Sequence, residues 1–356
     1  MLTDIQYNFL SLLRAGLGLT ASASLKPADW DSLKALALQH GLLTIMVDGV
    51  DKVPLDLRPS KAILLELIGL SMRDEQQHDL QWKSTCEFAK VLAKEDIKTY
   101  VLKGEVVAEC YPIPNHRTSA DFDCFLLPLK GDFDACEKAN CLMEERGYEA
   151  KRGYYKNSTI VLPYLIVENH RFLTPFRGNN KLKALEILLQ SMMRNDKGDD
   201  IMENTTLYRP PVMVTALFLI EHAYSHFLHE GLTWRHILDW ALFKKKHYNQ
   251  IAWSEFNGFI DEFGFRAFYE SYERLGQFLI GEVLYDELTD KDRRMLSDVW
   301  APLDLHETLH GLKAKFQLAG NTWRARWKYR DFSSISWLKS LCTQVFGFFF
   351  IKHPIL

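Results

Sequence analysis

Apolar and polar residues follow different periods in three successive parts of the chain. Residues 1–95 carry apolar side chains at helical spacing, residues 96–180 contain short β-rich runs, and residues 181–356 return to helical spacing. This pattern predicts an α+β fold, in which a small mixed-sheet core is flanked by N- and C-terminal helical regions. We expect the three parts to be three domains.

The N-terminal part is expected to contain three helices. One is predicted near residues 5–13, a second begins near Pro27 and ends at Gly41, and a long third helix covers residues 61–94. The middle of the long helix, residues 73–78, is strongly polar. This composition predicts a stretch that passes through solvent.

The central part is expected to form five strands and a helix that lies between the second and third strands. The helix is predicted from about Asp132 to Arg146, with Gly147 at its C-terminal end. Strands and helices in this order predict a small sheet with mixed strand directions. The predicted strands are Thr99–Leu102, Asp121–Leu127, Tyr148–Lys151, Thr159–Leu162 and Tyr164–His170.

The C-terminal part is expected to be a helical bundle, because its many aromatic residues recur at the spacing of helix packing. A polar segment over residues 195–209 is expected to be a mobile loop. The predicted helices are Lys181–Arg194, Val212–His229, Trp234–His247, Trp253–Phe263, Arg266–Ile280, Arg293–Trp300, Leu303–Leu318 and Ser336–Phe349.

Composition narrows the class of protein. The chain has 356 residues, 47% apolar and 25% charged, which is typical of a globular protein, and a net charge of −3. This balance gives no general basic field, so a nucleic-acid partner is not expected. Six cysteines occur without a CxxC pair, which favours reduced thiols in a cytoplasmic protein. The longest hydrophobic stretch, between Lys339 and Lys352, has 12 residues, and no transmembrane segment is expected.

Two acidic residues at the start of the second predicted strand carry the first candidate chemistry. Asp121 and Asp123 lie two positions apart, so both side chains leave the same strand face and can bind one or two divalent cations. The turn at Lys103 and Gly104, between the first strand and a following helix, is suited to binding a phosphate. Together these features favour phosphoryl or nucleotidyl transfer.

The same residues carry a family resemblance that covers roughly residues 30–240. Its central pattern is Leu102-Lys103-Gly104, Tyr111-Pro112, Arg117 and Asp121-Phe122-Asp123-Cys124-Phe125-Leu126. Flanking matches are Leu38-Gln39-His40-Gly41-Leu42, Val167-Glu168-Asn169-His170, His222, His226 and Trp234-Arg235-His236-Ile237-Leu238-Asp239. In this order and spacing the chain resembles the uncharacterised nucleotidyltransferase family of bacterial proteins, within the polymerase-β-like nucleotidyltransferase superfamily.

The resemblance implies a nucleotidyltransferase that uses Mg²⁺ or Mn²⁺ to transfer a nucleoside monophosphate from an NTP to an unknown acceptor, which is a small molecule, a sugar phosphate or a protein. It assigns metal binding to Asp121 and Asp123 and a third acidic role, as metal ligand or base, to Glu168. Phosphate contacts are assigned to Lys103, Gly104 and Arg117, and a hydrogen-bonded supporting role to His170. Two positions depart from the pattern: the wider superfamily usually has Gly-Gly or Gly-Ser at residues 103–104, and the family more often has aspartate at residue 168.

Each assignment has a purely structural alternative. Asp121 and Asp123 could be exposed acids at a strand start, and Lys103 a solvated strand end. Arg117 could form an ion pair with Asp121 or Asp123, and Glu168 one with Arg171. Three further features remain open: the helix face that carries His222, His226 and His229, the Arg235–Asp239 pair at helical spacing, and the basic and aromatic run over residues 323–330.

Two other classes of function remain open. An Asp-x-Asp strand also suits a metal-dependent glycosyltransferase that uses a sugar nucleotide, although the sheet that usually precedes this motif is missing because residues 1–95 have a helical pattern. The third hypothesis is a non-catalytic nucleotide-binding or regulatory protein with this fold. It predicts that function does not depend on Asp121 or Asp123.

Overall fold

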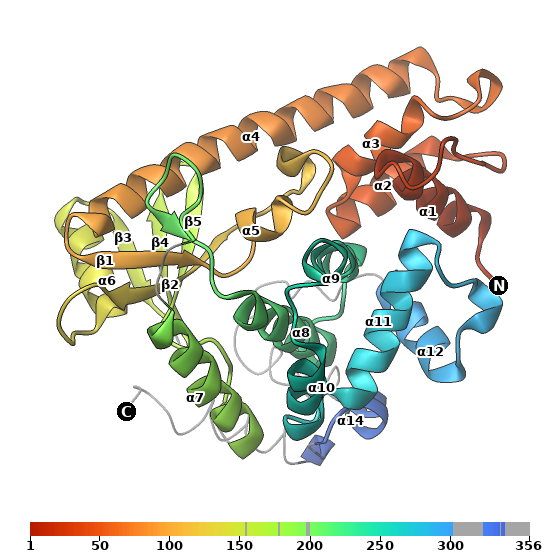
Figure 1. The fold of residues 1–356 in the computed structure, drawn as a ribbon. Coiled ribbons are helices and arrows are strands. Elements are labelled where there is room, and N and C mark those ends of the chain that lie inside the picture. The colour runs from red at the N-terminus through yellow and green to blue at the C-terminus, as the bar shows by residue number, and fades with distance from the viewer. Residues whose placement is uncertain (154, 177–178, 197–199, 302–322, 335, 339–356) are drawn as a thin grey trace.

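The computed structural model describes residues 1–153, 155–176, 179–196, 200–301, 323–334 and 336–338 (Figure 1). A mixed sheet lies at one end of the molecule, and helices from both terminal parts form the other end. The helix expected over residues 303–318 lies outside the described residues, as does almost all of the one expected over residues 336–349.

The N-terminal part folds into helices α1 (Asp4–Gly16), α2 (Trp30–His40) and α3 (Leu43–Val50). Helix α2 begins three residues after Pro27, because the Asp29 side chain caps it by accepting hydrogen bonds from the backbone of Asp31 and Ser32. Gly41 ends α2 with a φ of 64°, in the left-handed region that glycine adopts without strain. Helix α3 was not predicted.

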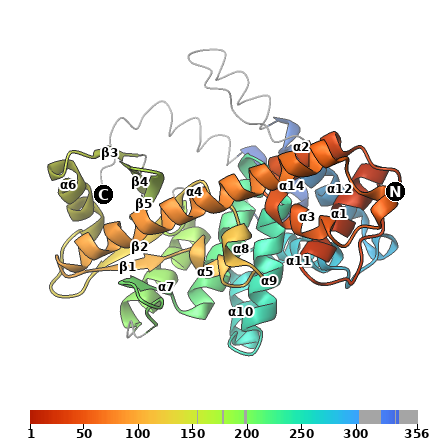
Figure 2. The same ribbon diagram turned by 90° about the horizontal axis from the view of Figure 1, so that it is seen from above.

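The long helix α4 (Lys61–Ala93) agrees with the range predicted for it, begins at a Ser60 cap and runs from the N-terminal helices to the sheet (Figures 1 and 2). Its polar middle is exposed to solvent on one side, at Arg73, Gln76 and Gln77, and contacts protein on the other. The Nε2 atom of His78 lies 3.2 Å from Glu105, and Glu75 lies 3.1 Å from Nε2 of His116. The polar residues of α4 therefore bind the segment that follows the first strand.

The sheet has six strands in the order β3-β4-β5-β2-β1-β6. Strand β2 is parallel to β5 and antiparallel to β1, so the sheet is mixed, as predicted. The short β6 pairs in parallel with β1 inside the segment that was expected to be a mobile loop, and this corrects that expectation. The strands are β1 (Ile97–Val101), β2 (Phe122–Pro128), β3 (Glu149–Arg152), β4 (Asn157–Leu162), β5 (Leu165–His170) and β6 (Leu207–Tyr208).

Alternation along β2 divides the core between the two faces of the sheet. Phe122, Cys124 and Leu126 belong to one buried cluster, which includes residues of α4 and of α6 (Ala135–Glu145). Phe125 and Leu127 belong to a second cluster, which extends through the C-terminal helices. Asp123 shares the face of Phe125, so its carboxylate points toward the C-terminal helices.

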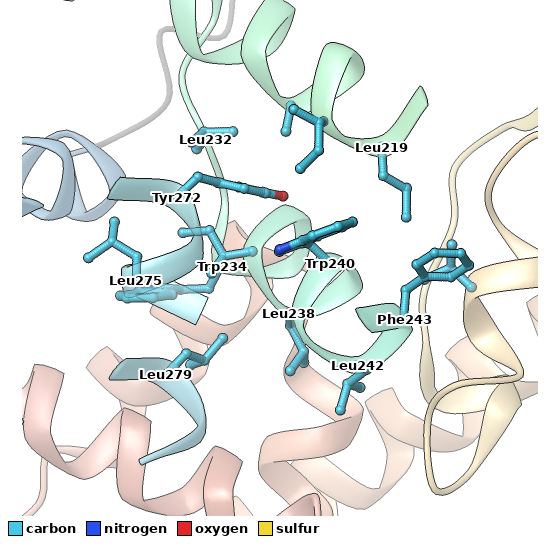
Figure 3. Packing of buried hydrophobic residues seen from close by; sticks show 14 of the residues in the cluster. Leu219, Leu232, Trp234, Leu238, Trp240, Leu242, Phe243, Tyr272, Leu275 and Leu279 are labelled. Carbon is cyan, nitrogen blue, oxygen red and sulfur yellow. The ribbon is translucent and has the colours of Figure 1, made fainter. Parts of the chain in front are cut away.

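The C-terminal helices pack through aromatic residues, as their spacing predicted. Figure 3 shows Trp234 and Trp240 of one helix beside Tyr272 and Leu275 of another, and all four side chains are buried. No helix among the described residues has the length and apolar character needed to cross a membrane. The helices are α7 (Asn180–Asn195), α8 (Val212–His229), α9 (Trp234–His247), α10 (Trp253–Glu262), α11 (Arg266–Ile280), α12 (Asp290–Trp300) and α14 (Arg326–Phe332).

The basic and aromatic run over residues 323–330 includes the first five residues of α14 and packs partly against the rest of the protein. Lys328 and Tyr329 are buried, and the Nζ atom of Lys328 lies 2.7 Å from the Asp298 carboxylate. The Arg326 guanidinium lies over the Trp323 ring. These contacts favour the interpretation of this run as a packed helix with aromatic anchors.

Candidate functional site

The candidate site is built around Asp123, which is only 1% exposed. The parallel pairing of β2 with β5 places Asp123 directly opposite Glu168. His170 follows Glu168 on the same strand face, and its Nε2 atom lies 2.9 Å from Asp123 Oδ1 and 3.5 Å from Glu168 Oε2. Two acids and an imidazole that the sequence separates by about 45 residues therefore meet because their strands are neighbours.

Lys103 joins this group from the end of β1. Because β1 and β2 are antiparallel, the residue after β1 returns to the start of β2, where Leu102 N–H donates to the Asp123 carbonyl. The Lys103 Nζ atom lies 3.1 Å from Asp123 Oδ2 and 3.1 Å from Nε2 of His222 in α8. Lys103 thus links the acidic group to the C-terminal helices.

Gly104 turns the chain into α5 (Glu105–Ala108) with a φ of 68°. A Cβ atom placed at Gly104 would meet no atom within 4 Å, so the backbone conformation and not lack of space requires glycine here. Helix α5 is only four residues long. The turn therefore positions Lys103, and a phosphate site at this turn needs donors beyond the short helix.

Asp121 lies one residue before β2 and is half-buried. Two clusters of possible metal ligands have their ligand atoms within 4.8 Å of one another among the described residues. One is His222, His226 and His236, and the other is Asp123, Glu168 and His170, which does not include Asp121. The side chains that gather around Asp123 are therefore those of Glu168 and His170 on the neighbouring strand, and not that of Asp121, the other acid of the Asp-x-Asp pair. Asp121 lies at the edge of the group, within electrostatic range of Lys103 and Arg235.

The two aspartates have opposite protonation tendencies. Burial opposes ionisation of Asp123, but the Lys103 ammonium and the hydrogen bond from His170 outweigh it and hold the pKa of Asp123 well below its usual range. Burial and the Asp123 charge raise the pKa of Asp121. Acids so close together with diverging pKa values are typical of functional sites.

The donor set of this group fits a divalent cation. Two ligand atoms of one Mg²⁺ ion lie at most about 4.2 Å apart, because Mg–O distances are near 2.1 Å. The ligand atoms of Asp123 and Glu168 lie within 4.8 Å of each other, and Glu168, at 35% side-chain exposure, has room to move closer. Oδ2 of Asp123 is buried and lies 3.1 Å from the Lys103 ammonium, so a metal bound at this oxygen would take the place that Lys103 now holds or share the oxygen with it.

Arg117 forms neither of the ion pairs that the sequence suggested. Its Nε and Nη2 atoms donate to the two carboxylate oxygens of Asp239 in α9, both at 2.8 Å, and the Tyr111 hydroxyl donates to the same carboxylate at 2.7 Å. The Arg235–Asp239 ion pair, one of the open interpretations of their helical spacing, is absent among the ion pairs of the described residues, because Asp239 binds Arg117. Arg235 instead donates to the Thr118 carbonyl.

The histidines of α8 group differently from the prediction. His222 and His226 lie with His236 of α9, with ring centroids 4.4 Å apart for the first pair and 4.9 Å apart for His226 and His236. His229 turns away, and its Nδ1 atom contacts the Ser225 carbonyl. His236 belongs to the 234–239 motif, and no role was predicted for it.

Arg235 is the other residue that the sequence analysis left without a site role. The motif around Gly41 explains its position: Nδ1 of His40 accepts the Trp234 N–H, and a Cβ atom at Gly41 would lie 3.5 Å from Cδ of Arg235. Three separate motif segments, at residues 40–41, 117–118 and 234–235, thus meet around one guanidinium. Their joint presence in the sequence was the signal that could have identified Arg235.

Behind the site, the buried carboxyl group of Glu221 in α8 is expected to make the stability of the protein depend on pH. Its side chain is fully buried, neither oxygen has a hydrogen-bond partner among the described residues, and burial raises the pKa of Glu221 to about 7. The folded protein therefore binds a proton that the unfolded chain releases between about pH 4.5 and pH 7, so stability falls as pH rises through this window. Because the Gln side chain does not ionise, we expect Glu221→Gln to lose roughly 3 kcal/mol less unfolding free energy than wild type as pH rises through this window.

The measurement is urea unfolding at pH 5 and pH 8. Glu270→Gln, which makes the same change on an exposed part of α11, is the control and should follow the wild-type pH dependence. If Glu221→Gln also follows the wild-type dependence, Glu221 is not the group that titrates.

Comparison with known proteins agrees with the class that this fold and site define, a mixed-sheet nucleotidyltransferase core. A family model described as uncharacterised nucleotidyltransferase matches residues 26–279, and the chain belongs to this family. The match includes every segment that carried the resemblance and extends it through α11, so the predicted family is confirmed. Neither a curated protein nor a solved structure matches the chain.

Proposed function

We propose that the protein is a Mg²⁺- or Mn²⁺-dependent nucleotidyltransferase that transfers a nucleoside monophosphate from an NTP to an acceptor hydroxyl or phosphate. The observation that carries the proposal is the in-register pairing of Asp123 with Glu168 on neighbouring parallel strands, with Lys103 in contact with Asp123. Membership of the nucleotidyltransferase family supports the same class of reaction.

Asp123 and Glu168 would hold the metal, with Asp121 beside them. A divalent cation at this position supplies charge neutralisation for the phosphates and for the leaving group. His170 donates to Asp123 and so keeps this carboxylate oriented toward Glu168. His170 thereby acts as a positioning residue, which fits the supporting role that the sequence suggested.

In the proposed reaction, the acceptor oxygen attacks the α-phosphorus of the NTP. A new P–O bond forms to the acceptor while the bond to the bridging oxygen of the β-phosphate breaks, and pyrophosphate leaves. Glu168 is partly exposed and is placed to take the proton where the acceptor is a hydroxyl. Lys103 remains charged, because Asp123 and Asp121 outweigh the burial that would lower its pKa, and it can contact the phosphates.

The test is a panel of the four labelled NTPs with Mg²⁺ or Mn²⁺ and candidate acceptors of each class. We expect pyrophosphate release and a labelled acceptor with at least one NTP, and loss of both in the Asp121→Ala/Asp123→Ala double variant. Identical behaviour of wild type and double variant, without NTP binding by either, would contradict the proposal. Turnover of UDP-sugars without use of NTPs would instead identify a glycosyltransferase.

A further inference from the structure

Charge is divided unevenly along the chain. Residues 323–356 contain six Lys and Arg but only one acidic residue, Asp331, which gives them a net charge of +5. Residues 1–322 have a net charge of −8. A basic segment in an otherwise acidic chain is typical of contact with an anionic partner, such as a lipid surface or a nucleic acid.

Within this segment, α14 buries one side and exposes the other. Tyr329 and Phe332 pack into the C-terminal helices and are at most 3% exposed. Arg324, just before the helix, and Arg326 and Arg330 within it are exposed. Figure 1 shows α14 on the side of the helical end that lies away from α4. The buried side therefore fixes α14 on the protein, and the exposed side is left for a partner.

Two of the exposed arginines carry charges that no acid balances. Among the described residues, Arg324 and Arg326 form no ion pair, whereas the Nε atom of Arg330 lies 2.7 Å from the Asp331 carboxylate. The Arg326 guanidinium lies over the Trp323 ring, 4.4 Å from its centroid. Arg324 and Arg326 can therefore meet a negatively charged surface without breaking an ion pair.

Large apolar side chains lie beside these arginines. Trp323 is 55% exposed and Leu338 61% exposed. The Trp323 ring meets the Trp337 ring edge-on, with centroids 5.4 Å apart, so the two tryptophans join into one patch. We call Trp323, Arg324, Arg326, Trp337 and Leu338 the basic aromatic patch. Apolar side chains that lie together at the surface, next to unpaired cations, indicate a contact surface.

The residues that follow the patch have a matching composition. Residues 345–351, Val-Phe-Gly-Phe-Phe-Phe-Ile, contain no polar side chain, and the apolar stretch around them lies between Lys339 and Lys352. No acidic residue occurs after Asp331. Tryptophan, phenylalanine and leucine combined with lysine and arginine are typical of segments that lie in the interface of a bilayer.

We propose that the basic aromatic patch and the residues that follow it bind the surface of a lipid bilayer that contains anionic lipids. The arginines would contact the lipid phosphates, and the apolar side chains of the patch would enter the boundary between headgroups and acyl chains. The stretch between Lys339 and Lys352 has 12 residues, too few to span the hydrocarbon core, so the attachment is peripheral. The inference goes beyond the proposed function and does not depend on it.

A nucleic acid fits the arginines of this segment but not its apolar residues. Phosphates can pair with Arg324 and Arg326, and bases can stack on the tryptophan rings. The side chains of residues 345–351, however, offer neither a cation nor a hydrogen-bond donor. A bilayer accepts cations at its headgroups and apolar side chains below them. The bilayer surface is therefore the partner that the whole segment fits.

The experiment is co-sedimentation of the full chain with vesicles of phosphatidylcholine alone, and with vesicles of phosphatidylcholine and phosphatidylglycerol in equal amounts. We expect at least about tenfold tighter binding to the anionic vesicles, and loss of this preference in high salt, which screens exposed charges. Arg324→Gln/Arg326→Gln should weaken binding to anionic vesicles by on the order of 10- to 30-fold, because each cation contributes about fivefold near such a surface.

Two further double variants keep the test decisive. Trp323→Ala/Leu338→Ala removes two exposed apolar side chains and should weaken binding to both kinds of vesicle. Lys83→Gln/Lys90→Gln removes two charges from exposed positions of α4 and should bind as wild type does. All the substituted side chains are exposed, and circular dichroism shows whether each variant is folded.

Absence of binding to either kind of vesicle would overturn the inference, as would wild-type binding by both patch variants or an equal loss in the α4 variant. Binding of a single-stranded oligonucleotide that depends on Arg324 and Arg326, without vesicle binding, would overturn it by assigning the patch to a nucleic acid. A dimer that the patch variants dissociate, without vesicle binding, would overturn it by assigning the patch to a contact between two copies of the chain. Light scattering measures this last outcome.

Discussion

Asp123→Asn is expected to lower the rate of nucleotidyl transfer by on the order of a thousandfold. Asp123 is almost fully buried, faces Glu168 across two parallel strands, and is held ionised by Lys103 and His170. The amide keeps the shape of the side chain but loses the charge and one acceptor oxygen that a divalent cation needs. Single-turnover release of pyrophosphate from the NTP identified by the panel measures the loss.

The matched control for this prediction is Asp132→Asn, which makes the same change at an exposed position before α6. It should leave the rate within about twofold of wild type. Circular dichroism and the thermal midpoint show whether Asp123→Asn is folded, since Lys103 and His170 lose their acidic partner in this variant. A folded Asp123→Asn protein with the wild-type rate would remove Asp123 from the reaction and favour the non-catalytic hypothesis.

Helices whose ends are marked by residues within the same segment were predictable from the sequence. The ends of α8, α9 and α11 agree with the prediction, because apolar periodicity and a local boundary residue mark each helix: Pro211 before α8, Thr233 at the start of α9 and Gly281 at the end of α11. Strand β6 was not predictable in this way. It has two residues and forms only because Thr99 and Tyr100, more than 100 positions earlier, supply its partner. A pairing this distant leaves no periodic pattern in its own segment.

Within the site, the residues that belong to a motif were predictable from the sequence, but the contacts between distant segments were not. The Asp-x-Asp spacing and the family pattern identified Asp123, Glu168 and Lys103, which the structure does bring together. An ion pair between Arg235 and Asp239 was one of two open interpretations of their helical spacing, yet Asp239 binds Arg117 from another segment. Spacing on one helix indicates which residues of that helix lie close together. It does not indicate which of several nearby cations Asp239 binds, because this depends on how the other segments pack around its buried carboxylate.

This Arg117–Asp239 pair gives the largest expected effect on stability. Asp239 is 5% exposed and Arg117 4%, and Tyr111 donates to the same carboxylate. Asp239→Asn leaves the Arg117 charge buried without a counter-charge, and breaking such a pair typically costs about 3–5 kcal/mol. We therefore expect urea unfolding of Asp239→Asn to show a loss of this size.

The pair between Arg266 and Asp261 provides the matched control, because it has the same bidentate geometry at an exposed place. Its two hydrogen bonds measure 2.7 and 2.8 Å, but the Asp261 side chain is 62% exposed. Water can replace the lost contact there, so Asp261→Asn should barely change stability. Similar losses in the two variants would show that geometry alone sets the strength of these pairs. A large loss confined to Asp239→Asn would show that the buried pair attaches α9, and with it Arg235, to the segment between Tyr111 and Asp123 that leads into β2.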